Sequence, residues 1–292
     1  MKRLVAWLRM GRPLILPGGI LAYGLGLAMG YWQVRSFDWG PALAGFLVTE
    51  VTNLVAHYAD EYADVDTDTL TRRTWFSGGS GVLPAGLVPA SWALWSAVIL
   101  AVLAVALTVA SIAMGLLSPH AGWIVGLGLL GGWFYSMPPV ELEWRGLGEV
   151  DNALLGGILM PLMGYTTQVG RPTLLALVAL LPIFLMVLVN LLGVHWPDRQ
   201  ADAAVGRRSL VVIAGERVRR LYHVLVAFAY LMVLGLTGWI LPLPVTAALL
   251  LTLPVSLWAA VTFARQPSPI PSALAMAVAI AAASAGWVVA AV

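Results

Sequence analysis

An acidic stretch, residues 53–68, carries the first set of side chains in this sequence that can do chemistry. It reads NLVAHYADEYADVDTD. If the stretch is helical, positions i, i+4, i+7 and i+11 share one face. Those positions hold Asn53, His57, Asp60 and Asp64. The spacing therefore predicts a row of oxygen-rich side chains along one side of a helix.

A second acidic pair lies far downstream. In the run HWPDRQAD, Asp198 and Asp202 are four residues apart and share a helix face. Carboxylate and amide oxygens, in a chain without cysteine, suit Mg²⁺ rather than zinc. Mg²⁺ in proteins is commonly held by one or two carboxylates together with substrate phosphate oxygens. Two such faces turned toward each other would hold Mg²⁺ ions that bridge a diphosphate.

The elements that must position these groups are membrane helices. Of the 292 residues, 60% are hydrophobic and 10% are charged, against about 25% charged in an average soluble domain. A spanning helix needs about 20 mostly apolar residues. We predict an all-α polytopic membrane protein, one domain over residues 1–292, with nine transmembrane helices. The predicted spans are Pro13–Tyr31, Trp39–His57, Val88–Leu116, Ala121–Met137, Gly148–Gln168, Thr173–His195, Leu221–Leu241, Pro244–Ala264 and Ile270–Val292.

The basic residues predict the orientation of these spans. With the N-terminus in the cytoplasm, 14 of the 16 Lys and Arg residues lie on the cytoplasmic side, and only Arg35 and Arg171 lie outside. This agrees with the positive-inside rule. The net charge of +2 rests on so few charged residues that it does not indicate a nucleic-acid partner. We therefore expect a protein of the cytoplasmic membrane whose acidic groups face the cytoplasm.

A diphosphate at the end of an apolar helix bundle indicates a prenyl diphosphate, because its isoprenoid tail would lie among the helices. Neutralising the diphosphate makes it a better leaving group and leaves cation character at C1, which an electron-rich aromatic ring can attack. The aromatic run 133–135 would stabilise that cation, or would form only an interfacial aromatic belt. The basic residues that would neutralise phosphate, or serve only as positive-inside anchors, are Arg72, Arg73, Arg145, Arg207 and Arg208. The acids that we interpret as solvated are Glu61, Asp66 and Asp68.

These motifs resemble the UbiA superfamily of intramembrane prenyltransferases. That family has nine transmembrane helices and two aspartate-rich motifs, after the second and the sixth helix. The stretch from Asn53 to Asp64 is similar to the first of these motifs, and DRQAD at 198–202 is similar to the other. The resemblance covers essentially the whole chain. It implies that the diphosphate is bound through Mg²⁺ by Asp60, Asp64, Asp198 and Asp202.

Two further segments narrow the resemblance. FSGGSGVLPAGLVP, at 76–89, resembles a segment of 1,4-dihydroxy-2-naphthoate polyprenyltransferases, and FYSMPPVELEWRGLGE, at 134–149, is similar to the family's YSxPPxxLKxRGLGE. The chain departs from the family at His57, where an aspartate is frequent, and at Glu143, where a lysine is common. The residues that the resemblance assigns to substrate binding are Asn53, Tyr135 and Arg145. Arg72 and Arg208, which follow the two acidic clusters, are expected to contact the diphosphate as well.

The sequence therefore predicts an enzyme that transfers a polyprenyl group from a polyprenyl diphosphate to an aromatic acceptor, with Mg²⁺ as cofactor. The expected acceptor is 1,4-dihydroxy-2-naphthoate, as in menaquinone biosynthesis. The acceptor could instead be 4-hydroxybenzoate, homogentisate or a tetrapyrrole. An ion-coupled transporter is the alternative from another class. It is disfavoured because the acids lie at helix ends rather than in the middle of the bilayer.

Overall fold

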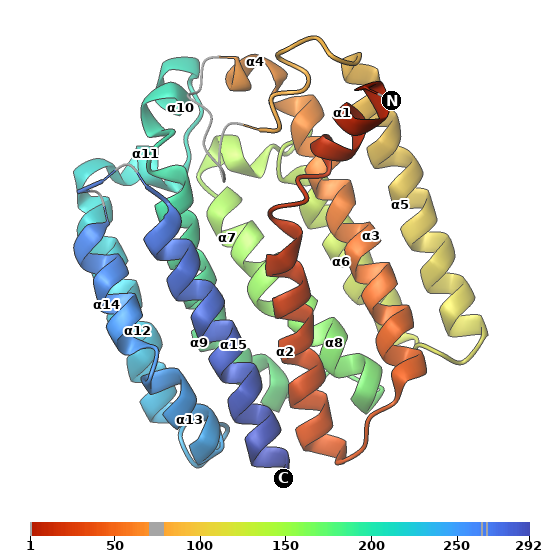
Figure 1. Cartoon of the computed structure of the whole chain (residues 1–292), viewed down its shortest axis with the longest axis vertical. Helices are drawn as coiled ribbons and strands as arrows, with labels where there is room; N and C mark the ends of the chain where they lie inside the picture. Colours follow the sequence, from red (N-terminus) through yellow and green to blue (C-terminus); the bar gives the residue numbers. More distant parts are fainter. Residues whose placement is uncertain (1, 70–78, 264, 267) are drawn as a thin grey trace.

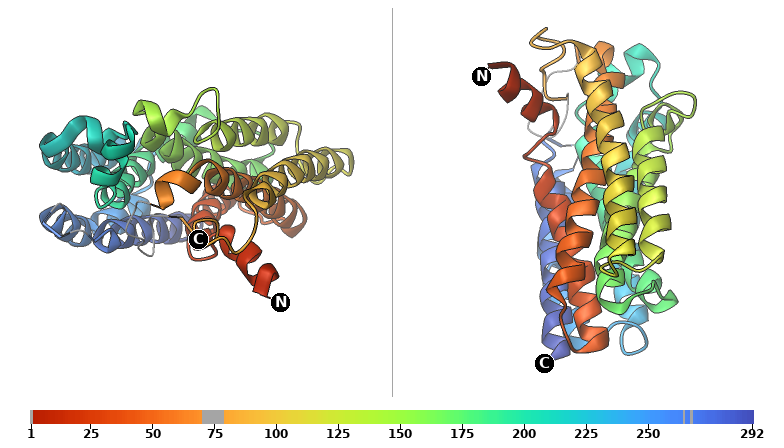
Figure 2. Two further views of the ribbon diagram at one scale, coloured as in Figure 1. Left: turned by 90° about the horizontal axis from the view of Figure 1, so that it is seen from above. Right: turned by 90° about the vertical axis from the view of Figure 1, so that its right-hand side faces the viewer.

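The chain folds into a bundle of long helices that run along one axis (Figure 1). A computed structural model describes residues 2–69, 79–263, 265–266 and 268–292. The bundle is broad in the view of Figure 1 and narrow when it is turned by 90° (Figure 2). Within these described residues the only β pairing is an isolated bridge between Thr237 and Leu241, so the expected all-α class is confirmed.

The helical segments have the following bounds. They are α1 (Lys2–Met10), α2 (Leu16–Val34), α3 (Trp39–Ala63), α4 (Val65–Asp68), α5 (Ala90–Ala113), α6 (His120–Phe134), η1 (Leu142–Arg145), α7 (Gly148–Leu154), η2 (Leu155–Leu159), α8 (Met160–Val169), α9 (Leu174–His195), α10 (Arg199–Val205), α11 (Leu210–Ala214), η3 (Gly215–Arg217), α12 (Val218–Leu236), α13 (Leu243–Leu250), α14 (Leu253–Thr262) and α15 (Ile270–Ala291).

Each predicted span contains helix in the structure. Within the part of the chain that the structure describes, five segments qualify as membrane spans by length and hydropathy: Ala90–Ala113, Leu174–His195, Leu210–Leu236, Leu243–Thr262 and Ile270–Ala291. The count of nine and the placement of the N-terminus stay predictions. Two spans differ from their expected form: Gly148–Gln168 contains the π-helical segment η2, and Pro244–Ala264 is divided into α13 and α14. The division falls just before Pro254, which cannot donate a backbone hydrogen bond to the preceding turn.

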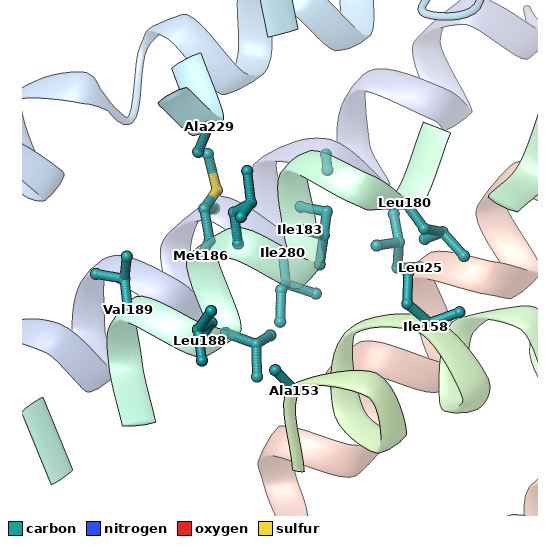
Figure 3. Packing of buried hydrophobic residues seen from close by; sticks show 14 of the residues in the cluster. Leu25, Ala153, Ile158, Leu180, Ile183, Met186, Leu188, Val189, Ala229 and Ile280 are labelled. Atoms are coloured by element: carbon teal, nitrogen blue, oxygen red, sulfur yellow. The ribbon is translucent and has the colours of Figure 1, made fainter. Parts of the chain in front are cut away.

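Helix α9 forms the centre of the bundle. In its most apolar window 67% of the residues are buried, against 28% for α5 at the edge. Figure 3 shows Leu180, Ile183 and Met186 of α9 packed among residues of its neighbours, such as Ile158 and Ile280. The outer helices instead expose large apolar side chains, as expected where lipid is the solvent. On α5 these include Trp95, Ile99, Val102 and Val109.

Capping residues set where α3, which carries the first acidic motif, and α9, which leads to the second, begin. The Asp38 side chain accepts a hydrogen bond from Gly40 N (3.0 Å) before α3, and Thr173 Oγ1 accepts one from Ala176 N (3.1 Å) before α9. From these caps α3 runs for 25 residues and α9 for 22. At about 1.5 Å per residue both helices cross the full bundle, so their acidic ends meet at the same side. The short helices α4, α10 and α11 lie at that end, which is uppermost in Figure 1 and is called the acidic end below.

Candidate active site

The first acidic motif lies where α3 ends. Asp60 is in the last turn of α3, and Asp64 follows as its C-terminal cap, with its backbone N–H bonded to Asp60 O (2.9 Å). Both carboxylates are buried. His57 lies one turn before Asp60, and its buried Nε2 has no hydrogen-bond partner in the described part of the chain. Asn53 lies seven residues before Asp60, which is about 10 Å along the helix axis at about 1.5 Å per residue. Its side chain lies beside Glu50 and α2.

Arg12 connects this motif to the N-terminal segment. Its Nη2 lies 2.8 Å from Asp60 Oδ2, and its Nε donates to Glu61 Oε1 at 2.9 Å. Glu61 also accepts hydrogen bonds from the backbone N–H and the hydroxyl of Ser80. The prediction that Glu61 is solvated is therefore wrong, whereas Asp66 is indeed exposed. Glu61 is enclosed because it joins three segments: the N-terminal turn, α3 and the loop before α5.

Arg207 brings the two acidic motifs together. Its Nη1 lies 3.0 Å from Asp64 Oδ2 in the first motif and 3.9 Å from Asp202 Oδ1 in the second. Its Nη2 forms an ion pair with Glu143 Oε2, from the loop between α6 and α7. One guanidinium thus holds carboxylates from three distant parts of the chain. The expected meeting of the two acidic groups at one end of the bundle is observed.

The second motif is held by its own short helix and by the segment that follows. Asp198 is the residue before α10, and Asp202 lies within it. Asp202 is buried, and its Oδ2 accepts a hydrogen bond from Ser209 Oγ (3.2 Å). Its carbonyl accepts a further bond from Arg207 N (2.9 Å). This turn places the Arg207 side chain toward the carboxylates, while Arg208 is exposed.

The other residues expected to bind substrate lie in different settings. Tyr135 is the C-terminal cap of α6, and its carbonyl accepts a hydrogen bond from Glu143 N (3.0 Å), so it belongs to the acidic end. Arg145 is exposed, and its Nη2 donates to Pro139 O (2.9 Å) within its own loop. Arg72 falls outside the residues that the structure describes. The structure therefore brings Tyr135 to the cluster and leaves the Arg145 guanidinium at the surface.

A pair that the spacing argument did not use, Glu149 and His195, holds together the helices on either side of the second motif. Glu149 begins α7, and its Oε1 lies 3.1 Å from His195 Nδ1 at the end of α9. The same oxygen accepts a hydrogen bond from Leu210 N (2.8 Å), at the start of α11. Glu149 thus connects the helix before the second motif with the helix after it. No short-range signal marks this pair, because its partners are 46 and 61 positions away in sequence.

Crowding and burial determine the pKa values of the charged side chains at the acidic end. Burial raises the pKa of Asp202 to about 6 and that of Asp68 to about 8. Burial and the neighbouring Asp60 also raise the pKa of Asp64, against the opposing effect of Arg207. For Arg207, burial alone would lower the pKa, but the surrounding carboxylates outweigh it and raise the pKa. A further cation would favour the ionised carboxylates, because the arginines only partly offset the cost of burying them.

The donor set fits a hard divalent cation. Asp60, Asp64 and Glu143 each offer one carboxylate oxygen, and these three atoms lie within 4.8 Å of one another. In each residue one buried oxygen, Oδ1 or Oε1, lacks a hydrogen-bond partner among the residues described. Buried oxygens of this kind are costly unless a cation or a donor reaches them. The residues at the acidic end are therefore suited to Mg²⁺, which prefers carboxylate oxygen ligands.

Comparison with known proteins identifies the family. The model of the UbiA prenyltransferase family matches residues 20–282. A 1,4-dihydroxy-2-naphthoate octaprenyltransferase of Bacillus subtilis (strain 168) is 24% identical over 152 residues, which are 51% of this chain and 45% of that protein. The match thus spans less than half the length of that relative.

Two solved structures share the fold over nearly the whole chain. A UbiA homologue from Archaeoglobus fulgidus bound to DMAPP and Mg²⁺ superposes with a TM-score of 0.70 at 17% identity, covering 95% of this chain and 99% of that one. A structure described for digeranylgeranylglyceryl phosphate synthase gives 0.69 at 16% identity, covering 100% and 99%. Since the family model covers most of the sequence and the folds agree, this chain belongs to the UbiA prenyltransferase family and is a multi-pass membrane protein.

Proposed function

We propose that the chain transfers a polyprenyl group from a polyprenyl diphosphate to 1,4-dihydroxy-2-naphthoate, with Mg²⁺ held by Asp60, Asp64, Asp198 and Asp202. The observation that carries this proposal is the Arg207 network, which joins both acidic motifs at one end of an apolar bundle. A diphosphate needs such a charged end, and an isoprenoid tail needs the apolar helices beside it.

Side chains at different depths in the bundle would have different roles. The four aspartates would hold Mg²⁺, which when bound shields the diphosphate and makes it a better leaving group. Arg145 and Arg208, which are exposed, would contact diphosphate oxygens from the outer side, and Arg72 would be a further phosphate contact. Tyr135 and Asn53 would line the substrate on the inner side. We propose these roles because of where the residues lie at the acidic end.

The bond changes follow from these positions. The C1–O bond of the prenyl diphosphate breaks, and its electron pair leaves with the diphosphate. A ring carbon of the acceptor then donates its electron pair to C1. With 1,4-dihydroxy-2-naphthoate, the carboxylate on that carbon leaves as carbon dioxide, and the electrons of the broken C–C bond restore the aromatic ring. The product is the prenylated hydroquinone, which dissolved oxygen oxidises to the quinone after release. The Tyr135 ring, at the end of α6, would stabilise positive charge at C1 through its π face.

The choice of acceptor has its own support. The named activity of the Bacillus subtilis relative is the same reaction, and the segments 76–89 and 134–149 agree with it. To test it, purified protein in detergent would be given a polyprenyl diphosphate and 1,4-dihydroxy-2-naphthoate, with and without Mg²⁺. A prenylated naphthoquinone that forms only with Mg²⁺, detected by mass spectrometry, is the expected result. Product only with 4-hydroxybenzoate, homogentisate or a tetrapyrrole would overturn the acceptor and keep the transferase.

We also propose nine spans, an N-terminus in the cytoplasm and an acidic end that faces the cytoplasm from the cell membrane. The chain has no cysteine, so single introduced thiols report sidedness without background. Glu216→Cys places a thiol in η3, between α11 at the acidic end and α12, and Arg171→Cys places one in the connection from α8 to α9. That connection is at the opposite end of the bundle (Figure 1). In intact cells a membrane-impermeant maleimide should label only Arg171→Cys. The reverse pattern would contradict the orientation, and labelling of both would contradict the span count.

A further inference from the structure

We infer that Glu143, from the loop between α6 and α7, is a direct cation ligand that completes a three-carboxylate site with Asp60 and Asp64. This inference deepens the proposed function and rests on it in one respect, that the cation is the Mg²⁺ of prenyl transfer. The site would then join the first acidic motif to a loop some 80 positions further along the chain.

The burial of Glu143 is the first step of the argument. Its side chain is 1% exposed, although it sits in a loop that follows a helix end. The backbone sets its direction: Glu143 N donates to Tyr135 O (3.0 Å), which folds the loop back onto α6. A carboxylate so enclosed is stable only when charged partners surround it. Glu143 therefore has a local structural reason to point into the cluster rather than into solvent.

The pattern of pairing is the second step. Asp60 uses Oδ2 for Arg12, Asp64 uses Oδ2 for Arg207, and Glu143 uses Oε2 for Arg207. The other oxygen of each carboxylate is buried and has no hydrogen-bond partner within the described ranges of the chain. Each acid can therefore bind a cation without releasing its arginine. Three buried acids thus each pair one oxygen with an arginine and keep the other without a hydrogen-bond partner among the described residues.

Distances and charge are the third step. One ligand oxygen from each of the three residues lies within 4.8 Å of the others. On one octahedral Mg²⁺, with about 2.1 Å to each ligand, trans oxygens are about 4.2 Å apart and cis oxygens about 3 Å apart, so the three side chains would have to close by up to about 2 Å to share one ion. The ion pairs of Arg12 and Arg207 involve Asp60, Glu61, Asp64, Glu143 and Asp202. In the described part of the chain these pairs set five carboxylates against two guanidinium groups, which leaves negative charge for a divalent cation.

The decisive experiment uses the absence of cysteine in the natural sequence. Glu143→Cys introduces the only thiol, and a thiolate that binds Cd²⁺ gives an ultraviolet charge-transfer band. Titration of the purified, substrate-free protein with Cd²⁺ should produce this band, and excess Mg²⁺ should reduce it. Glu141→Cys, two residues away in the same loop, is the matched control and should give none. Adding Asp64→Asn to Glu143→Cys should weaken Cd²⁺ binding.

A second measurement removes the dependence on the reach of a shorter side chain. Isothermal titration with Mg²⁺, without substrate and then with inorganic pyrophosphate, should show at least about tenfold weaker binding for Glu143→Gln than for Glu141→Gln or the natural protein. Thermal unfolding without metal checks that each variant is folded. Unchanged Mg²⁺ affinity in Glu143→Gln, or no cation binding under either condition, would overturn the inference.

These readouts separate the inference from the proposed function. Cation binding with the thiolate band, but no prenyl transfer in the product assay, would leave the ligand assignment standing and remove the reaction. Prenyl transfer that depends on Mg²⁺, with no role for Glu143 in cation binding, would support the reaction and remove the ligand assignment.

Discussion

Two buried glutamates at the acidic end differ in a way that separates structural support from chemistry. Glu61 and Glu143 are each 1% exposed, and each forms an ion pair with an arginine. Both oxygens of Glu61 have partners, which are Arg12 and Ser80. Glu143 instead keeps one oxygen without a hydrogen-bond partner in the described residues. Two side chains with the same burial and charge thus have different roles. The unpaired oxygen identifies Glu143 as the one that can bind a cation.

The same contrast extends to the two arginines. Arg12 holds Asp60 and Glu61, neighbours at the end of one helix, and so fixes the N-terminal segment in place. Arg207 holds Asp64, Glu143 and Asp202, which come from three segments. We therefore expect changes around Glu61 to lower stability more than activity, and changes around Arg207 to lower activity more than stability.

The largest effect is expected from Asp64→Asn. This change keeps the shape of the side chain but removes the charge that faces Arg207 and the proposed cation, so kcat/KM should fall by about 10²–10³-fold. The melting temperature should change little, because the neutral amide relieves repulsion with Asp60. Steady-state assays and thermal unfolding measure the two quantities. Asp66→Asn, on the exposed side of the same turn, is the control, and retention of more than half of the activity in Asp64→Asn would contradict the assignment.

Glu61→Gln should show the opposite behaviour. It removes the second carboxylate that Arg12 pairs with, beside Asp60, and leaves Ser80 without a charged acceptor. The free energy of unfolding should fall by about 2–3 kcal/mol, since the Arg12 side chain is partly solvated. Activity per folded molecule should stay within about threefold of the natural protein, a difference worth under 1 kcal/mol. Denaturant unfolding in detergent, with Glu216→Gln as the exposed control, measures the loss. A large loss of kcat without a loss of stability would show that Glu61 takes part in the chemistry.

The effect of pH should distinguish the metal-free from the metal-bound protein. Aspartate in an unfolded chain has a pKa near 3.9, whereas burial raises the pKa of Asp202 to about 6 and of Asp68 to about 8. The folded state therefore binds more protons than the unfolded state between about pH 4 and 8, so stability from these groups is lost as pH rises. Without metal, the melting temperature should fall from pH 5.5 to 8.5. Mg²⁺ binds the ionised carboxylates, so its stabilising effect should grow over the same range.

Asp68→Asn refines this test. It removes the group whose pKa is raised to about 8, so the metal-free decline above pH 7 should become shallower while the decline near pH 6 remains. A stabilisation by Mg²⁺ that does not change with pH would contradict the picture of protons and Mg²⁺ competing for the same carboxylates.

The limits of the sequence can be seen in the same residues. Helical spacing places Asn53, His57 and Asp60 on one face of α3, because that relation is local and follows from the helix period alone. The structure adds partners that lie far apart: Arg12 and Glu61 are 49 positions apart, Arg207 and Glu143 are 64, and Arg207 and Asp64 are 143. These pairs arise from how the helices pack, so no short pattern announces them. The departure of Glu143 from the family segment was visible in the sequence, but its burial beside Asp60 and Asp64 was not.

The smallest effect tests how finely the second motif is adjusted. Ser209 donates a hydrogen bond to Asp202, and this bond lowers the pKa of Asp202 against the larger effect of burial. Ser209→Ala should therefore raise that pKa further and weaken Mg²⁺ binding by about 0.5–1.5 kcal/mol, roughly 2–10-fold. The loss should be larger at pH 6 than at pH 8, because protonation of Asp202 competes with the cation only at the lower pH. Titration calorimetry at both values measures it. An equal loss at the two pH values would mean that Ser209 positions the α10–α11 turn rather than the charge of Asp202.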